Sequence, residues 1–158
     1  MATKNLEPGA HKAEDTAAIS DEQRKLIKAL LKGDLEIGFS ESFVHDRGVK
    51  LESYSYSIPV LPSQVAKALK QATDLLATLP KDVRAGLKLD LKTGNEVPKE
   101  LGAQAYMVVI ESTWHRASVE DVEPIKKKLR GIGDKLMDEF APDGIKKAYR
   151  FVKELRRG

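Results

Sequence analysis

The chain has 158 residues, of which 41% are apolar and 32% charged, and it carries a net charge of +3 with an isoelectric point near 9.0. A chain of this length hides roughly 68–70% of its surface on folding, so one hydrophobic core is feasible without disulfides, and the sequence contains no cysteine. The longest uninterrupted apolar stretch, Ala105 to Ile110, is far shorter than the roughly 20 residues that cross a bilayer. Composition therefore argues against membrane insertion, wholesale disorder and thiol chemistry.

The first predicted elements are a polar leader and a helix. Residues 1–19 lack apolar periodicity and the apolar core of a signal peptide, which predicts a flexible leader on a cytoplasmic protein. Ser20 and Gln23 have the spacing of a capping box, apolar residues then recur at helical spacing, and Gly33 supplies a stop. The pattern predicts a helix over 20–33, at the start of a single domain that extends to residue 158.

A hairpin is predicted next. Apolar and polar residues alternate from Leu35 to Phe43, and the turn sequence Asp46-Arg47-Gly48 precedes a second alternating run that ends at Val60. The apolar parity of the second run changes near Glu52-Ser53, which predicts a β-bulge there. Pro59 and Pro62 favour an edge or terminal position for the end of this strand.

The second half of the chain repeats the order of helix and strands. Ser63 is placed to cap a helix that Pro80 ends, residues 87–91 alternate as a half-exposed strand before the turn at 93–95, and Tyr106 to Ile110 is apolar on both parities. Such a run is typical of a central strand. Ser118 and Asp121 cap the next predicted helix, with Pro124 in its first turn, and a last helix follows Ala141-Pro142-Asp143-Gly144.

These elements predict an α+β fold: an antiparallel sheet of four to five strands with helices packed mainly on one face, in the order α-ββα-ββα-α. The repeated strand-strand-helix unit suggests an internal duplication, although no residue-level repeat supports it.

No motif predicts a catalytic site, a metal site or a cofactor. The three histidines, at positions 11, 45 and 115, lack metal-ligand spacing. The segment 38–42 lacks the second glycine of a nucleophile elbow, and Gly131-Ile132-Gly133 lies within a predicted helix, where close packing or a kink explains it better than phosphate binding. Asp90 and Glu111 could hold a divalent cation on adjacent strands, but a solvated Asp90 and a Glu111 paired with a base are the simpler interpretation.

Two features are candidates for binding. Glu111, Trp114, His115 and Arg116 lie at the end of the predicted central strand; the alternative is that Trp114 closes the core while its neighbours face water. Eleven lysines and arginines against seven aspartates and glutamates make residues 121–158 basic. Within them, spacings of four, three and four residues align one row along the last helix: Lys146, Arg150, Lys153 and Arg157. Such a row could meet phosphates or an acidic partner, or could be a solvated face.

We therefore expect a small non-enzymatic binding or adaptor protein, which recognises a protein partner or a second copy through its sheet edge or its basic last helix. Tyr54 and Tyr56, set among serines, could serve that contact or form part of the core. The alternatives are a nucleic-acid-binding protein that uses the cations of the last two helices, and a small enzyme or ligand-binding domain with a site between Trp114 and Arg116.

Overall fold

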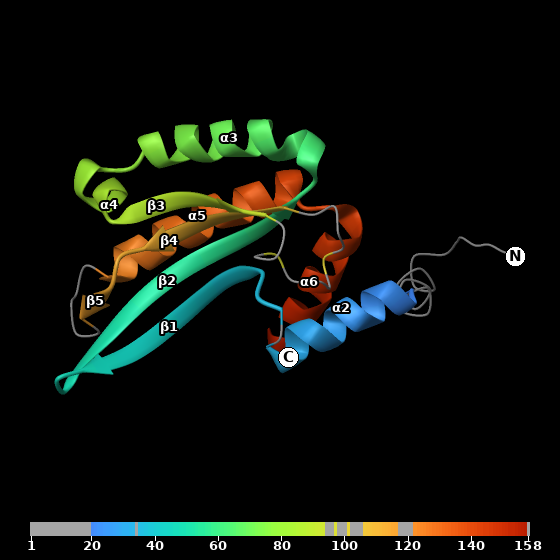
Figure 1. Ribbon diagram of the computed structural model, residues 1–158, viewed down its shortest axis with the longest axis horizontal. Coiled ribbons are helices and arrows are strands. Elements are labelled where there is room, and N and C mark those ends of the chain that lie inside the picture. Colours follow the sequence, from blue (N-terminus) through green and yellow to red (C-terminus); the bar gives the residue numbers. More distant parts are fainter. Residues whose placement is uncertain are drawn as a thin grey trace, which may run out of the picture.

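Four strands form one antiparallel sheet in the computed structural model, in the order β1-β2-β4-β3 (Figure 1). The strands are β1 (Gly38–Asp46), β2 (Val49–Val60), β3 (Leu87–Lys92) and β4 (Tyr106–Ser112), and the two-residue β5 (His115–Arg116) pairs with the outer half of β2. The structure describes residues 20–33, 35–93, 97, 101, 106–116 and 122–157. The predicted leader, the glycine and asparagine of the turn at 93–95, and the Ser118–Asp121 cap lie outside these residues.

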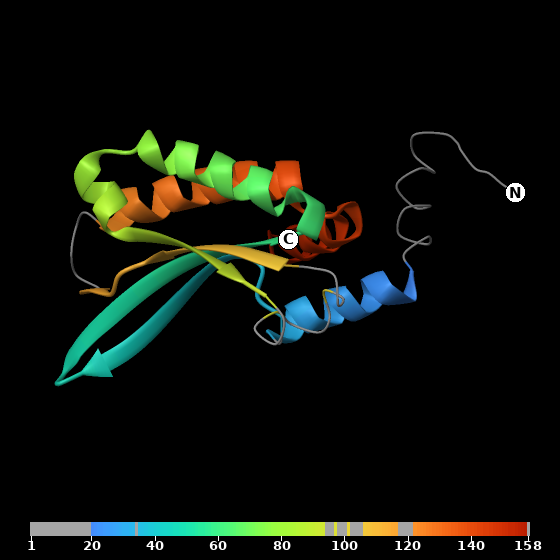
Figure 2. The same cartoon turned by 45° about the horizontal axis from the view of Figure 1, so that its top comes forward.

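The helices lie mainly on one face of this sheet, as predicted. Figure 2 shows α3 and α5 side by side over the strands, and α2 with α6 at one end. Their bounds are α2 (Asp21–Lys32), α3 (Val65–Ala77) preceded by the 3-10 turn η1 (Pro62–Gln64), α4 (Lys81–Ala85), α5 (Val122–Phe140) and α6 (Asp143–Arg157). Within the described residues, no helix is both long and apolar enough to cross a membrane.

The capping signals of α2 function as the sequence predicts. The Ser20 hydroxyl accepts a hydrogen bond from the Gln23 backbone N–H at 3.1 Å, and the Gln23 side chain accepts one from the Ser20 N–H. At the other end Gly33 adopts φ +81°, a left-handed conformation that a residue with a side chain rarely adopts. These two signals therefore fix both ends of the helix.

Pairing across the sheet separates an apolar face from a polar one. One row runs Phe39, Tyr56, Ile110 and Leu89 through all four strands, on the face that α3 and α5 cover. The neighbouring row, Ser40, Ser55, Glu111 and Lys88, lies on the opposite face, because successive residues of a strand point to opposite sides. As predicted, β4 has a central position, which it shares with β2, and Val108 and Ile110 are 1% and 0% exposed.

Two glycines allow tyrosine side chains to pack closely between the helices and the sheet. The Tyr56 ring lies where a Cβ on Gly133 of α5 would stand, and the Tyr149 hydroxyl of α6 lies where a Cβ on Gly38 would stand. Gly38 also adopts φ +81°. The Gly131-Ile132-Gly133 segment therefore serves close packing at Gly133, which is one of the two explanations that its sequence suggests.

The predicted bulge near Glu52-Ser53 is wrong for the β1–β2 pair. Pairing continues without interruption from Gly38 with Ser57 to Asp46 with Val49. Val49 and Leu51 lie on the face opposite to Tyr54, because successive residues of a strand point to opposite sides. The apolar residues change face along β2 because its outer half extends beyond the helices, so no helix covers that half (Figure 1). The turn itself is confirmed: Arg47 and Gly48 have φ +52° and +80°, as in the two-residue hairpin turns whose twist matches that of strands.

Other boundaries differ in ways that local chemistry explains. Ser63 lies inside η1 and makes no capping bond, and the five-residue α4 follows Pro80, where no helix was predicted. Pro59 is tolerated within β2 because β1 pairs only as far as Ser57, so the end of β2 has a hydrogen-bonded neighbour on one side only.

Candidate functional site

The bulge that the sequence places in β2 lies instead on the strand opposite. Ser55 pairs with Glu111 and Glu52 pairs with His115, so two residues of β2 face three residues between β4 and β5. The Tyr54 backbone N–H donates to the Ser112 hydroxyl at 2.8 Å, and the Thr113 N–H donates to the Gly86 carbonyl at 3.0 Å. The extra residue bends the chain at Thr113 and Trp114.

This bend leaves Trp114 at the surface, and its side chain is 48% exposed. The interpretation that Trp114 closes the core is therefore wrong. Glu111 lies in the body of the sheet, where its carboxylate is 4.0 Å from the Lys92 ammonium, consistent with the expected pairing of Glu111 with a base. His115 and Arg116 pair with β2 through their backbones, and their side chains are outside the described part. Of the described side chains in this set, neither Glu111 nor Trp114 lines either of the two hollows described below.

Tyr54 and Tyr56 are core residues, each 1% exposed, so neither ring can contact a partner. The Tyr54 hydroxyl donates to Glu52 at 3.0 Å, and the Tyr56 hydroxyl donates to Asp134 of α5 at 2.5 Å. Burial, and then these hydrogen bonds to carboxylates, raises the pKa of both phenols above its ordinary value. Both therefore stay protonated at neutral pH; the Tyr56 bond joins α5 to the sheet, whereas the Tyr54 bond stays within β2.

A charged cluster lies beside Tyr54, between β1 and α5. The Lys126 ammonium is 3.1 Å from Glu41 and 3.2 Å from Glu123, and it lies 5.2 Å from the centre of the Tyr54 ring. Burial alone would lower the pKa of Lys126, but its hydrogen bonds to the two glutamates outweigh that effect and raise it. The positive charge of Lys126 is therefore already paired with two carboxylates of the same chain.

The predicted basic row on α6 is largely occupied by local contacts. Lys146 donates to the Asp138 carbonyl at 2.7 Å, and Arg150 forms an ion pair with the Asp138 carboxylate. Lys153 lies 5.5 Å from the centre of the Tyr149 ring, and the side chain of Arg157 is not described. The α5 helix supplies the partners of Lys146 and Arg150, both from Asp138, while Arg150 and Lys153 remain exposed, so this row contacts α5 at one point and otherwise faces solvent.

An open groove lies between α3 and α5. It holds about 870 Å³, and its apolar lining comes from Leu75 and Leu79 on one side and from Pro124 and Ile132 on the other. Gly131 lies midway along the α5 side, where a Cβ would meet no atom within 4 Å. The missing side chain leaves the centre of the groove open. A second, smaller hollow of about 170 Å³ lies near the start of β1, against α2 and α6.

Cations line the α5 side of the α3–α5 groove. Its lining includes one carboxylate, that of Glu123. It also includes five lysine and arginine side chains: Lys126, Lys127, Lys128, Arg130 and Lys135. Lys126 is bound to Glu41 and Glu123, and Arg130 lies 4.2 Å from the centre of the Phe39 ring. Lys127, Lys128 and Lys135 form no ion pair with any residue in the described ranges. Their charges are therefore available to a ligand.

No family model, curated protein or solved structure matches this chain. Among the described residues, no three histidine, aspartate or glutamate side chains come close enough to hold a metal ion. Within the described residues, we therefore base the proposed function on the α3–α5 groove.

The groove is not evident from the sequence alone, although the sequence contains one signal of it. Lys127, Lys128, Gly131 and Lys135 recur at three- and four-residue spacing beside the apolar stripe of α5. The spacing shows that the lysines share a helix face. It does not show that Leu75 of α3 and Leu79, just beyond the end of α3, lie beside them, because that depends on how α3 packs on the sheet.

Proposed function

We propose that this protein is a non-enzymatic binding protein whose α3–α5 groove holds an acidic amphipathic segment of a protein partner. The observation that supports it is the combination of an apolar floor with an excess of cations, three of which are not engaged by the described residues. A partner helix with leucines on one side could lay them against Leu75 and the apolar stems of the lysines, above Leu79 and Ile132, which are 8% and 7% exposed, while its carboxylates meet the ammonium groups.

The dimensions of the groove suit a short helix. Lys127 and Lys135 are eight residues apart on α5, which corresponds to about 12 Å along a helix axis. A partner segment of about two to three turns covers this length. Ion pairs at the rim of such a groove contribute more to specificity and association rate than to affinity, so the buried leucines would supply most of the binding free energy.

Nucleic acid is the less suitable ligand for this surface. Proteins that bind single strands without sequence preference combine cations with aromatic rings on which bases stack. The lining of the groove contains no aromatic residue, and its floor is aliphatic. An apolar floor loses contact with water only when an apolar partner covers it, and a sugar-phosphate backbone does not do this.

The experiment is a titration of the protein into a fluorescent synthetic helix that carries leucines on one face and glutamates beside them. A matched peptide replaces each glutamate with glutamine. The glutamate peptide should bind at least tenfold more tightly at low salt, and the difference should shrink as salt rises, because surface charges are screened. Random RNA and DNA are titrated in parallel; tighter binding of either than of the peptide would overturn the proposal.

A matched pair of variants locates the site. Lys127→Glu with Lys135→Glu reverses two charges at the groove and should weaken binding of the glutamate peptide at least tenfold. Lys147→Glu with Lys153→Glu makes the same change of net charge on α6 and should weaken it less than threefold. Thermal melting establishes that both variants fold. Equal weakening by the two pairs would show that only net charge matters, and would refute the groove as the site.

A further inference from the structure

The outer edge of β1 is an unpaired strand edge. Its nine residues pair with β2 on one side, and no other described strand pairs with them. Asp46 and Val49 close a two-residue turn, which makes them a hydrogen-bonded pair, and such pairs alternate along an antiparallel ladder. The backbone N–H and C=O groups of Phe39, Glu41, Phe43 and His45 therefore point outward from the sheet.

The opposite edge of the sheet is better protected than β1. Within the described residues, a lysine of β2 lies at the β1 edge: the Lys50 ammonium is 4.4 Å from the centre of the Phe43 ring. The edge strand β3 has six residues, carries Lys88, Asp90 and Lys92, and its Leu91 N–H donates to the Asp90 carboxylate at 2.9 Å. Short length and charged side chains are the usual means of preventing strands from pairing between molecules. β1 contains no lysine or proline, and its one glutamate is bound to Lys126.

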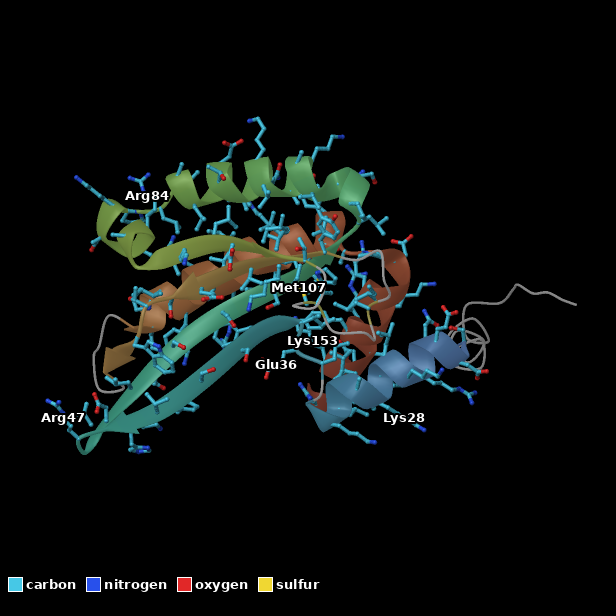
Figure 3. All side chains as sticks on the ribbon, in the orientation of Figure 1. Lys28, Glu36, Arg47, Arg84, Met107 and Lys153 are labelled. Atoms are coloured by element: carbon cyan, nitrogen blue, oxygen red, sulfur yellow. The ribbon has the colours of Figure 1, made fainter. Side chains whose placement is uncertain are left out.

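Exposed apolar side chains follow this free edge. Phe43 and Val44 are 48% and 42% exposed, and they lie in the outer half of the hairpin, which projects past the helices (Figures 1 and 2). Figure 3 shows Arg47 at the hairpin tip and Glu36 just before the other end of β1. A second β1 aligned antiparallel would bring the tip arginine of each copy toward the glutamate of the other, whereas a parallel alignment would bring like charges together.

We propose that β1 pairs antiparallel with β1 of a second copy around a twofold axis at Phe43, so that the two sheets become one. Centring the axis on Phe43 places the two Phe43 residues opposite each other and Glu41 opposite His45 of the second copy. An axis at Glu41 would oppose two carboxylates, and an axis at Ser42 would oppose Glu41 to Phe43. The Phe43 register thus places apolar opposite apolar and no carboxylate opposite a carboxylate.

The absence of cysteine makes this pairing directly testable. Facing residues of a hydrogen-bonded antiparallel pair have Cα atoms about 5.5 Å apart, within the range of a disulfide. Phe43→Cys should therefore form a covalent dimer under mild oxidation. Ser42→Cys and Val44→Cys should cross-link more slowly if the register is right, and Lys88→Cys, on the protected edge, should cross-link slowest.

Sedimentation equilibrium of the reduced proteins completes the test. The natural chain should be dimeric, and Phe43→Pro should be monomeric, because this proline removes an outward N–H that β2 does not use. A monomeric natural chain, a dimeric and folded Phe43→Pro variant, or Lys88→Cys cross-linking as fast as Phe43→Cys would overturn the proposal. Should Phe43→Pro not fold, the cross-linking rates decide alone. Peptide binding to the groove is a separate measurement, so either proposal can fail without the other.

Discussion

Two glycines of α5, two positions apart, have opposite surroundings. Gly131 opens onto the groove with no atom near its missing Cβ, whereas the Tyr56 ring fills that position at Gly133. Glycine inside a helix is about 0.8–1 kcal/mol less favourable than alanine, so Gly131→Ala should stabilise the protein by about 0.5–1 kcal/mol. Gly133→Ala should destabilise it by about 1–3 kcal/mol, because the ring must move. Urea denaturation measures both, and a loss of stability in Gly131→Ala would contradict the open groove.

Tyr56 predicts how stability responds to alkaline pH. Burial, and then the hydrogen bond to Asp134, raises the pKa of this phenol. An unfolded tyrosine loses its proton near pH 10. Above that pH the folded state therefore keeps a proton that the unfolded state has released, and the free energy of unfolding falls by about 1.4 kcal/mol per pH unit for this group. Below pH 10 the full stabilisation is present.

Tyr56→Phe should remove that share of the pH dependence. At neutral pH the variant should lose about 1 kcal/mol, the net contribution of one hydrogen bond, because the exposed Asp134 regains water. From pH 10 upward its stability should fall less steeply than that of the natural protein. Urea unfolding at a series of pH values measures both slopes, and parallel slopes would mean that Tyr56 ionises as easily in the folded protein as in the unfolded chain.

At the scale of elements, the strongest periodic signals predicted most of the fold. Alternation in 87–91, the two-sided apolar run from Tyr106 and the capping signals around α2 report local requirements, namely a half-exposed strand, a central strand and helix ends. The two strands each bury one or both faces, and burial of a face requires apolar residues at a fixed spacing that can be found in the sequence. Helix ends likewise require particular residues at fixed positions. The one-faced helical layer followed, since every predicted helix had a single apolar stripe.

The incorrect predictions concern features that depend on a neighbouring strand or helix. The parity change in β2 results from β2 extending past the helices, and the bulge itself is in the segment between β4 and β5, whose residues show no break in pattern. The candidate site was missed for the same reason: Lys127 and Gly131 mark a helix face, but the groove exists only because α3 lies beside it. Tyr54 and Tyr56, set among serines, turned out to be core residues because their strand faces α5.

The bulge gives a prediction at this scale. Ser112 accepts a hydrogen bond from the Tyr54 N–H and donates to the Thr113 carbonyl at 3.0 Å. Ser112→Ala removes both bonds and should lower the free energy of unfolding by about 1–2 kcal/mol. Ser55→Ala, on the polar face of β2, makes the same chemical change and should shift it by less than about 0.5 kcal/mol. Comparable losses in the two variants, measured by urea denaturation, would mean that Ser112 does not support the bulge.

At the scale of the whole molecule, the two proposed surfaces lie on different elements. The groove is formed by α3 and α5, while the free edge belongs to β1, on the side of the sheet away from β3. A dimer formed through β1 would therefore carry two grooves, and neither would be blocked by the pairing. A partner with two acidic helices would then bind one dimer more tightly than two separate chains, because its second helix binds at high effective concentration.

The central claim is that the α3–α5 groove receives an acidic amphipathic helix, and its most direct test is the map of backbone amide shifts when the glutamate peptide is added to ¹⁵N-labelled protein. We expect the largest shifts at Leu75, Leu79, Lys128 and Gly131, with one peptide bound per chain and little change along α6 or β1. Gly131→Gln, which fills the centre of the groove, should abolish these shifts while its melting temperature stays at or above that of the natural protein. Shifts concentrated at Lys146, Arg150 and Lys153, or unchanged binding by Gly131→Gln, would show that the groove is not the binding site.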